Sequence, residues 1–216
     1  MTNKDHKHYS SKYPDVPLEK HSISASLRKH LFMFKTLTGV FSYEKLDLGT
    51  EILIKHLIIP ESPENLLDLG CGYGPIGVVL GYETSTAEIF MVDINRRAVW
   101  CAKENIKVNL PQDRGRVKAL AGNYFEPFKN KEIRFDAIYM NPPIREGREE
   151  FFEVIEEITH YLKSDGFFQF VIRKKLGASY VTKYLRKTYP SFKTEIIAKR
   201  SGYWTSVFYK KKQKIE

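Results

Sequence analysis

One stretch of this chain, from residue 63 to residue 140, alternates short apolar runs with amphipathic segments. The apolar runs at 65–69, 88–93 and 116–122 have the length and composition of buried strands, and residues 95–109 carry the spacing of a helix. Strands that alternate with helices in this way form a parallel sheet with right-handed crossovers. The pattern therefore predicts an α/β fold built on a mostly parallel sheet.

The rest of the chain continues this alternation and then changes it. Ser201 and Gly202 join the last two predicted strands, which favours an antiparallel hairpin at the edge of the sheet. The predicted elements here are a strand at 135–140, a helix at 149–162, a strand at 166–173, a helix at 178–188, and strands at 193–198 and 203–209.

The chain has 216 residues, of which 42% are hydrophobic, so it can build one domain with a substantial core. Residues 1–26 are polar, and we expect them to form an N-terminal tail. We expect 27–216 to form the domain, with 27–60 as a small N-terminal extension and 61–216 as a Rossmann-like core. The extension contains a predicted strand at 30–41 and a helix pattern at 47–59.

The 35 lysines and arginines outnumber the 26 acidic residues, and the net charge of +9 favours a polyanionic partner such as RNA. Cys71 and Cys101 have no spacing typical of a disulfide framework or a zinc site, and the histidines show no metal-binding spacing. No apolar segment is long enough for a signal core or a membrane helix. We therefore expect a soluble, cytoplasmic, monomeric protein without a metal ion.

A glycine-rich loop follows the first predicted strand of the core, and residues 70–77 read GCGYGPIG. Glycines there let the backbone approach a ligand without a Cβ clash, and Asp93 ends the next strand, where a carboxylate can bind ribose hydroxyls. Two cofactors fit this pattern, a nicotinamide dinucleotide and S-adenosylmethionine. Asp68, just ahead of the glycines, would repel a pyrophosphate but suits an ammonium and a sulfonium group, so it favours S-adenosylmethionine.

Polar residues also follow the third predicted strand of the core, at 116–122. Asn123 is placed to accept a hydrogen bond from the adenine amino group of a cofactor, and a plain loop asparagine is the alternative. Tyr124 or Phe125 would then pack on the adenine ring.

Asn141, Pro142, Pro143 and Ile144 follow the predicted strand at 135–140, and two successive prolines fix the backbone in a rigid, extended path. The lone pair of an exocyclic base amine is delocalised into the ring, so the amine must be held by its two N–H groups to aim that lone pair. The side-chain carbonyl of Asn141 and the backbone carbonyl of Pro142 would be the acceptors. The target base would be unstacked from its helix and would pack on Pro143 and Ile144.

These residues resemble the class I methyltransferases and, more narrowly, the small-subunit ribosomal RNA guanine-N2 methyltransferase family and its short single-domain relatives. The glycine loop and Asp93 are shared by many methyltransferases, whereas FS followed by DLGT, together with NPPIR, is considerably narrower. The likeness covers most of the chain from about residue 31. The matching stretches are 39–42, 46–50, 68–74, 93–98, 123–124 and 141–145, with Gly147.

The resemblance implies a seven-stranded sheet with an antiparallel final strand and helices on both faces. It also implies methyl transfer from S-adenosylmethionine to a guanine N2 in small-subunit ribosomal RNA, with ribosomal RNA or a ribosomal subunit as the partner. Cofactor contacts are expected from Asp68, Gly70, Cys71, Gly72, Gly74, Asp93, Ile94, Asn123 and Tyr124, catalysis from Asn141 and Pro142, and substrate contacts from Phe41, Pro143, Ile144 and Arg145.

Two other functions stay open at this point. One is methylation of tRNA or of a protein glutamine, although the relatives that act on adenine or glutamine commonly carry an aromatic residue where this chain has Ile144. The other is a non-catalytic RNA-binding module with a vestigial cofactor pocket.

Several surface and core residues carry weaker expectations. Trp100 is predicted to pack in the core, and Tyr203 and Trp204 of the final hairpin are expected to pack in the fold, with stacking on a base as the alternative. Cations that follow the ends of predicted strands or the proline turn are candidates for phosphate contacts or for ordinary solvated surface, namely Arg145, Arg148, Arg173, Lys174 and Lys175.

Overall fold

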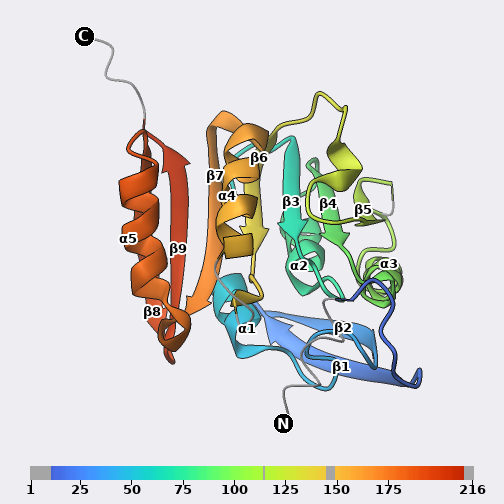
Figure 1. The fold of residues 1–216 in the computed structure, drawn as a ribbon. Helices are drawn as coiled ribbons and strands as arrows, with labels where there is room; N and C mark the ends of the chain where they lie inside the picture. Colours follow the sequence, from blue (N-terminus) through green and yellow to red (C-terminus); the bar gives the residue numbers. More distant parts are fainter. Residues whose placement is uncertain (1–10, 114, 145–148, 212–216) are drawn as a thin grey trace.

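A seven-stranded sheet organises the part of the chain that the computed structural model describes, residues 11–113, 115–144 and 149–211 (Figure 1). Its order is β5 (Val117–Ala121), β4 (Glu88–Asp93), β3 (Asn65–Leu69), β6 (Phe135–Met140), β7 (Leu162–Arg173), β9 (Tyr203–Lys210) and β8 (Phe192–Arg200). Neighbouring strands are parallel except that β9 runs antiparallel to β7 and β8. This confirms the predicted Rossmann-like α/β sheet with an antiparallel final strand.

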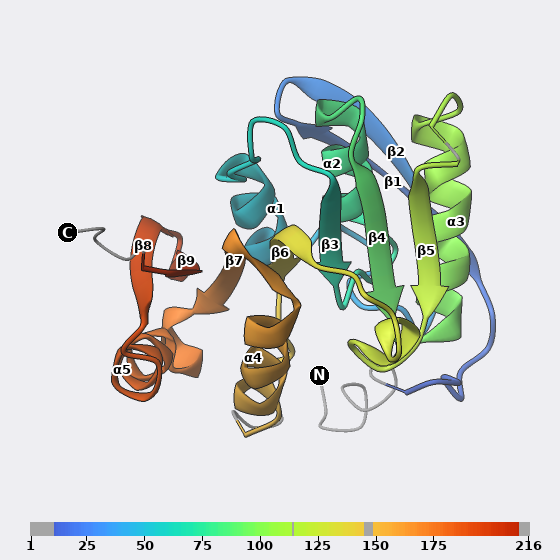
Figure 2. The same cartoon turned by 90° about the horizontal axis from the view of Figure 1, so that it is seen from above.

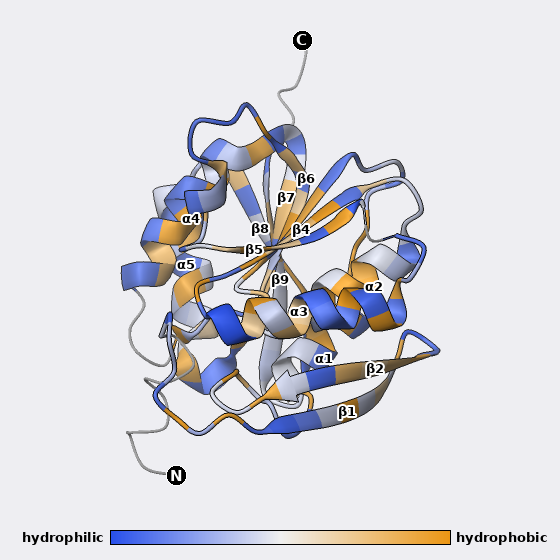
Figure 3. Ribbon diagram, turned by 90° about the vertical axis from the view of Figure 1, so that its right-hand side faces the viewer, coloured by the Kyte–Doolittle hydropathy of each residue, from blue (hydrophilic) through white to orange (hydrophobic). Residues whose placement is uncertain are grey.

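Helices cover both faces of the sheet, as predicted (Figure 2). One face carries α1 (Leu48–Lys55), α2 (Pro75–Glu83) and α3 (Arg96–Asn109), and the other carries α4 (Glu149–Tyr161) and α5 (Ala178–Thr188). In Figure 3 the ribbons of α3 and α4 show both hydrophilic and hydrophobic colours, as expected for helices with one buried face. None of the helices in the described part of the chain is long and apolar enough to cross a membrane.

A two-stranded hairpin, β1 (Lys20–Leu27) and β2 (His30–Leu37), precedes the sheet. The prediction of a tail as far as residue 26 is therefore wrong for residues 20–26. Ile23 and Leu27 of β1 are buried while the serines between them point outward, so this polar segment still alternates with the period of a strand. The strand predicted at 30–41 ends at Leu37, because the chain turns at Gly39 with a positive φ of 80°.

Two asparagine side chains of α3 close the outer edge of β2. Asn105 accepts a hydrogen bond from the Lys35 amide at 2.7 Å and donates to the Lys35 carbonyl at 2.9 Å. Asn109 makes the same pair of bonds with Met33, at 3.1 and 2.9 Å. Asn105 is fully buried and also donates to the carbonyl of Tyr73 at 2.8 Å. The amide of Asn105 thus joins the hairpin to the glycine loop.

Polar side chains of the sheet fix the segment that follows α1. Gln169 of β7 accepts from the Ile58 amide at 2.9 Å and donates to the His56 carbonyl at 2.7 Å, and the Tyr139 hydroxyl donates to the Ile58 carbonyl at 2.6 Å. Gln169 and Tyr139 are buried, so these bonds are shielded from water. α1 consequently ends at Lys55, although the apolar pattern continues to residue 59. The start of α1 is also held by a polar side chain, that of its N-cap Asp47.

β7 begins at Leu162, earlier than the predicted start at Gly166. The register shifts between Phe135 and Ala137 of β6, which marks a bulge opposite this part of β7. A Cβ on Gly166 would lie 2.8 Å from the Phe135 carbonyl oxygen, so the strands approach closely there. The glycine permits that approach inside the strand and does not mark its beginning.

Candidate active site

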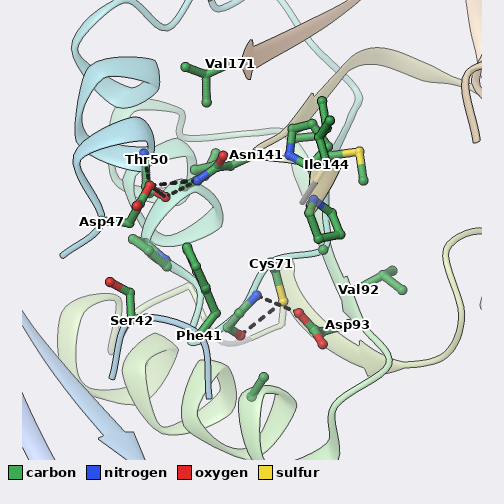
Figure 4. A pocket seen from close by; sticks show the side chains of 18 of the residues that line it. Phe41, Ser42, Asp47, Thr50, Cys71, Val92, Asp93, Asn141, Ile144 and Val171 are labelled. Atoms are coloured by element: carbon green, nitrogen blue, oxygen red, sulfur yellow. Dashed lines mark hydrogen bonds between the residues drawn. The ribbon is translucent and has the colours of Figure 1, made fainter. Parts of the chain in front are cut away.

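A cavity opens at the carboxyl ends of the parallel strands, beside the segment that leads into α1 (Figure 4). It brings together two groups of residues that lie far apart in the sequence. The cofactor half takes predicted residues from the loops after β3, β4 and β5, namely Gly70, Cys71, Gly72, Asp93, Ile94, Asn123 and Tyr124. The acceptor half takes the predicted residues Phe41, Asn141, Pro142, Pro143 and Ile144, together with Asp47, Thr50, Arg173 and Tyr203.

Two of the described residues that were predicted for the site are not part of this lining. Asp68 is buried and Gly74 turns the chain into α2, and neither residue lines the cavity. Arg145 lies outside the described residues, as do Gly147 and Arg148.

The glycine loop presents bare backbone to the cavity. Gly70 and Gly72 adopt positive φ angles of 72° and 56°, which side chains rarely tolerate. A Cβ at either position would meet no atom within 4 Å, so both residues face open space. A ligand can therefore approach the main chain closely at this point. Gly74 has a different role, since its φ of 91° turns the chain into α2 and its backbone packs near Met91.

Asp93 holds the open side of the loop. One carboxylate oxygen accepts from the Gly72 amide at 2.8 Å, and the other accepts from the Asn95 amide at 2.8 Å. Burial raises the pKa of Asp93 to about 6, against the lowering effect of these two amides. Each carboxylate oxygen keeps a second lone pair, so Asp93 can accept further hydrogen bonds from a diol in the cavity.

Asp68 supports the loop from below and is fully buried. One of its oxygens accepts from the Gly77 amide at 2.9 Å, which ties β3 to the first turn of α2. The other oxygen has no hydrogen-bond partner among the described residues. Burial raises the pKa of Asp68 to about 7, with the negative charge of Asp93 adding to the rise. Asp68 therefore acts on the cavity through the loop and through its charge.

The two aromatic candidates after β5 have different surroundings. Tyr124 lines the cavity beside Asn123, and its hydroxyl donates to Glu150 at 2.9 Å. Phe125 is buried and stacks on Tyr161 with ring centroids 4.3 Å apart. Of the two residues proposed to pack on an adenine ring, Tyr124 is thus the one with access to the cavity, and Phe125 belongs to the core.

Asn141 has a fixed orientation. Its Nδ2 atom donates to Asp47 Oδ2 at 2.9 Å and to Thr50 Oγ1 at 2.9 Å (Figure 4). An amide nitrogen has only two hydrogens, so both are engaged. The side-chain oxygen Oδ1 must then point away from Asp47 and Thr50, and it is left as an acceptor at the cavity.

Asp47 carries out two tasks with one oxygen. It is the N-cap of α1, because Oδ2 also accepts from the Thr50 amide at 2.9 Å. The same oxygen fixes Asn141, which lies 94 residues further along the chain. The sequence motif that contains these residues, DLGT, contributes to the resemblance, but no role was predicted for Asp47 or Thr50. The available signal was an acid before an apolar helix pattern, which indicates a cap and not a partner for a distant amide.

The proline turn is closed by its own backbone. The Pro142 carbonyl accepts from the Ile144 amide at 2.9 Å, and its second lone pair is available to another donor. Pro142 and Ile144 are buried, whereas Pro143 is half-buried. The turn is therefore rigid, and it carries a second carbonyl acceptor next to the Asn141 side chain.

The residues of the cofactor half suit S-adenosylmethionine. The bare loop at Gly70 and Gly72 is a cradle that a Cβ would fill, and Asp93 offers acceptors for ribose hydroxyls. Asp68 is buried behind the loop with one oxygen unpartnered among the described residues, and in its ionised form it would attract a cationic ligand. Within residues 11–113, 115–144 and 149–211, no three His, Cys, Asp or Glu side chains gather as a metal site would require.

The family model for the methyltransferase small domain matches residues 32–206 of this chain. The chain belongs to the methyltransferase small domain family. Its fold and family make it an S-adenosylmethionine-dependent methyltransferase at the level of reaction class, which agrees with the predicted class I resemblance.

Two relatives show which members of the methyltransferase small domain family this chain is similar to. It is 34% identical over 197 residues to the uncharacterized protein YbxB of Bacillus subtilis, covering 91% of this chain and 95% of that protein. It is 35% identical over 147 residues to the ribosomal RNA small subunit methyltransferase C of Shewanella loihica. That match covers 66% of this chain and 40% of the relative, so the chain spans less than half of its length.

A solved structure of a similar protein shares the fold. The T. thermophilus 16S rRNA N2 G1207 methyltransferase (RsmC), in complex with AdoMet and guanosine, superposes with a TM-score of 0.74 at 25% identity. The superposition covers 92% of this chain and 52% of that protein. The chain is thus similar to about half of RsmC.

Proposed function

We propose that this chain transfers a methyl group from S-adenosylmethionine to the exocyclic N2 of a guanine in small-subunit ribosomal RNA. The observation that carries the proposal is the orientation of Asn141, whose two N–H groups are bound by Asp47 and Thr50. Because Oδ1 is the only polar atom of the Asn141 side chain left for a ligand, the side chain can receive a hydrogen bond but cannot give one.

An exocyclic amine has two N–H groups, so two acceptors are needed to fix its orientation. The Asn141 Oδ1 and the Pro142 carbonyl are neighbours on one rigid turn, and each has a lone pair available. Together they would bind both N–H groups and direct the nitrogen lone pair towards the cofactor half of the cavity. The same two oxygens stabilise the positive charge that develops on the nitrogen as the N–C bond forms, until a proton leaves.

When bound, S-adenosylmethionine supplies a sulfonium methyl group that is already a strong electrophile. The residues of this chain therefore need only to position the nucleophile and to exclude water. The glycine loop and Asp93 would hold the cofactor, with Asn123 and Tyr124 near its adenine. The apolar faces of Pro143 and Ile144 would pack on the unstacked base.

The choice of guanine rests on relatedness and on one residue. RsmC is described with guanosine and AdoMet, and this chain matches about half of it. Ile144 stands where amino-methylating relatives that act on adenine or glutamine carry an aromatic residue, as noted above. The net charge of +9 agrees with an RNA substrate.

Methyl transfer with labelled cofactor tests this proposal. Small ribosomal subunits, naked small-subunit RNA, tRNA and a release factor are incubated separately with the protein, and labelled RNA is digested to nucleosides. We expect label in N2-methylguanosine from small-subunit RNA, and a rate of labelling about 100- to 1,000-fold lower with the Asn141→Ala variant. Label in protein only, or in adenosine only, would overturn the proposal. If the cofactor does not bind at millimolar concentration, the chain is instead a non-catalytic module.

A further inference from the structure

Five cations gather where β7 ends and where β8 turns into β9. The Lys174 amide donates to the Gly202 carbonyl at 2.7 Å, which joins the end of β7 to the β8–β9 turn. Lys174 and Lys175 belong to the short 3-10 helix η3 (Lys174–Leu176). We call the five residues the cationic rim: Arg173, Lys174, Lys175, Lys199 and Arg200.

The sheet register arranges the rim around the cavity. Arg173 and Arg200 both lie opposite Tyr203, one on each side of it. Residues directly opposite each other share a face of the sheet, so the two arginines flank the tyrosine on one face. Arg173 lies over the Tyr203 ring at 5.7 Å, and both residues line the acceptor half of the cavity. The row therefore leads from the cavity outward to Arg200.

The other face of the same sheet end is also basic. Lys199 lies opposite Trp204, with its ammonium 4.4 Å from the ring centroid. Lys174, Lys175, Lys199 and Arg200 are exposed. The rim thus places cations beside an aromatic ring on each face at one end of the sheet, and cations interleaved with aromatic residues are a feature of surfaces that bind single-stranded nucleic acid.

The charge of the rim is not neutralised by neighbours. Among the described residues, no ion pair joins any rim cation to a carboxylate, whereas Arg28, Arg116 and Lys163 elsewhere in the chain are paired. An unpaired cluster of like charges opposes folding by self-repulsion, and a bound polyanion would relieve that repulsion.

The other side of the mouth has the opposite sign. α4 begins beside the cavity and presents a row of exposed glutamates, and Glu150 among them lines the cavity. A polyanion would be repelled there and attracted on the side of β9, which contacts α1, and of the edge strand β8. The exposed glutamates of α4 are Glu149, Glu150, Glu153, Glu156 and Glu157.

We propose that the cationic rim binds the phosphates of the RNA strand that flanks the target base. This rests on the proposed function, which brings the base into the acceptor half of the cavity. The strand would then leave the cavity along the row of Arg173, Tyr203 and Arg200, away from α4, and pass over the edge strand β8, where Lys199 meets it from the other face. The rim determines where the RNA backbone lies, and Asn141 and Pro142 hold the base.

The test compares two double variants that lose the same charge. Lys199→Gln with Arg200→Gln changes exposed rim residues, and Lys183→Gln with Lys187→Gln changes exposed residues of α5. Binding of a fluorescein-labelled single-stranded RNA oligonucleotide is followed by anisotropy at several salt concentrations. Each phosphate contact to a single strand contributes roughly 0.7 to the slope of log K against log salt. We expect the rim variant to lose about 1.4 in slope and to bind roughly 25-fold more weakly at 0.1 M salt.

The α5 variant is the control, and we expect its slope and affinity to equal those of the wild-type chain. If the two variants bind RNA equally well, or if the wild-type chain binds no RNA, the proposal that the cationic rim binds RNA phosphates is wrong. The outcome for the proposed function is separate. If the rim variant binds RNA weakly but the wild-type chain methylates no RNA, the rim stands and the proposed function fails. Cofactor affinity, measured by calorimetry, is expected to be the same in all three proteins.

Discussion

The two halves of the cavity are built by different means. In the cofactor half, the parts that hold one another are close in sequence, as Asp93 binds the amides of Gly72 and Asn95. In the acceptor half, the decisive contacts run from Asn141 to Asp47 and Thr50, across 94 and 91 residues. The first half is formed by the loops after three neighbouring strands, β3, β4 and β5, whereas the second exists only when α1 is docked on the sheet.

We therefore expect cofactor binding to depend on the first half and the rate of methyl transfer to depend on the second. The glycine loop and Asp93 can form wherever the β3–α2–β4 unit folds, because the hydrogen bonds that join them lie within that unit. The acceptor half depends on α1, which Gln169, Tyr139 and Asn141 fix to β6 and β7. Substitutions in one half should therefore change one measurement and leave the other nearly unchanged.

The largest difference between kcat and cofactor binding is expected for the Asn141→Ala variant. It removes the side-chain acceptor, and losing a preorganised hydrogen-bonding group of this kind typically costs about 100- to 1,000-fold in rate. We expect kcat to fall by that amount while the Kd of the cofactor stays within about three-fold. Single-turnover kinetics and calorimetry measure the two quantities. A large loss of cofactor affinity would show that the halves are not separable.

The converse substitution is Gly72→Val in the cofactor half. A β-branched residue at a φ of 56° is strained, and its side chain would enter the space that faces the ligand. We expect the cofactor Kd to rise about 100-fold, with the same kcat once cofactor saturates. Gly115→Val, on an exposed loop away from the cavity, serves as the control. Unchanged cofactor binding in Gly72→Val would contradict the assignment of the loop.

Asp47→Asn tests the link between α1 and Asn141. Asparagine is as good an N-cap as aspartate, so the free energy of unfolding should hardly change. The carboxylate charge behind Asn141 is lost, which makes Oδ1 a weaker acceptor, and we expect kcat to fall about 10-fold. Thr50→Val, which removes one of the two partners of Nδ2 at nearly equal volume, should act in the same direction. Normal kcat in both variants would mean that Asn141 is oriented by other means.

The smallest effect concerns pH and the cofactor half. Burial raises the pKa of Asp68 to about 7 and that of Asp93 to about 6, so both carboxyls are largely protonated in the empty protein below those values. A cationic ligand favours the ionised forms, so we expect cofactor affinity to increase about 10-fold between pH 5.5 and 7. Asp68→Asn should flatten this dependence. Calorimetry in two buffers would also detect the proton released on binding, and its absence would refute the linkage.

The residues predicted to bind the cofactor come together at the cavity, and their sequence signals are local. A strand, a glycine loop and an acid at the end of the next strand occur in order, and Gly70, Gly72 and Asp93 all line the cavity. The sequence did not indicate that Asp68 is fully buried behind the loop and so does not line the cavity. Phe125 and Tyr124 are adjacent in sequence, and only the packing of Phe125 on Tyr161 decides which of them is core.

Long-range features were beyond the sequence patterns. Asp47 is recognisable as a helix cap, but nothing in its neighbourhood indicates that Asn141 shares its oxygen. Trp100 was predicted to be buried, yet it is 43% exposed, because the helix spacing that buries Val99 and Ala102 turns Trp100 outward. The strand at 20–27 was missed because its outward positions are serines, which made the segment look like a tail.

The asparagines of α3 have a consequence for the behaviour of the protein in solution. A strand edge with unpaired amides and carbonyls invites the strand of another molecule, and β2 also exposes Leu31 and Met33. Asn105 and Asn109 use up the backbone groups of Lys35 and Met33 within the chain. The two side-chain amides thus take the place of a neighbouring strand. They leave fewer backbone groups of the β2 edge free to pair with a strand of another molecule.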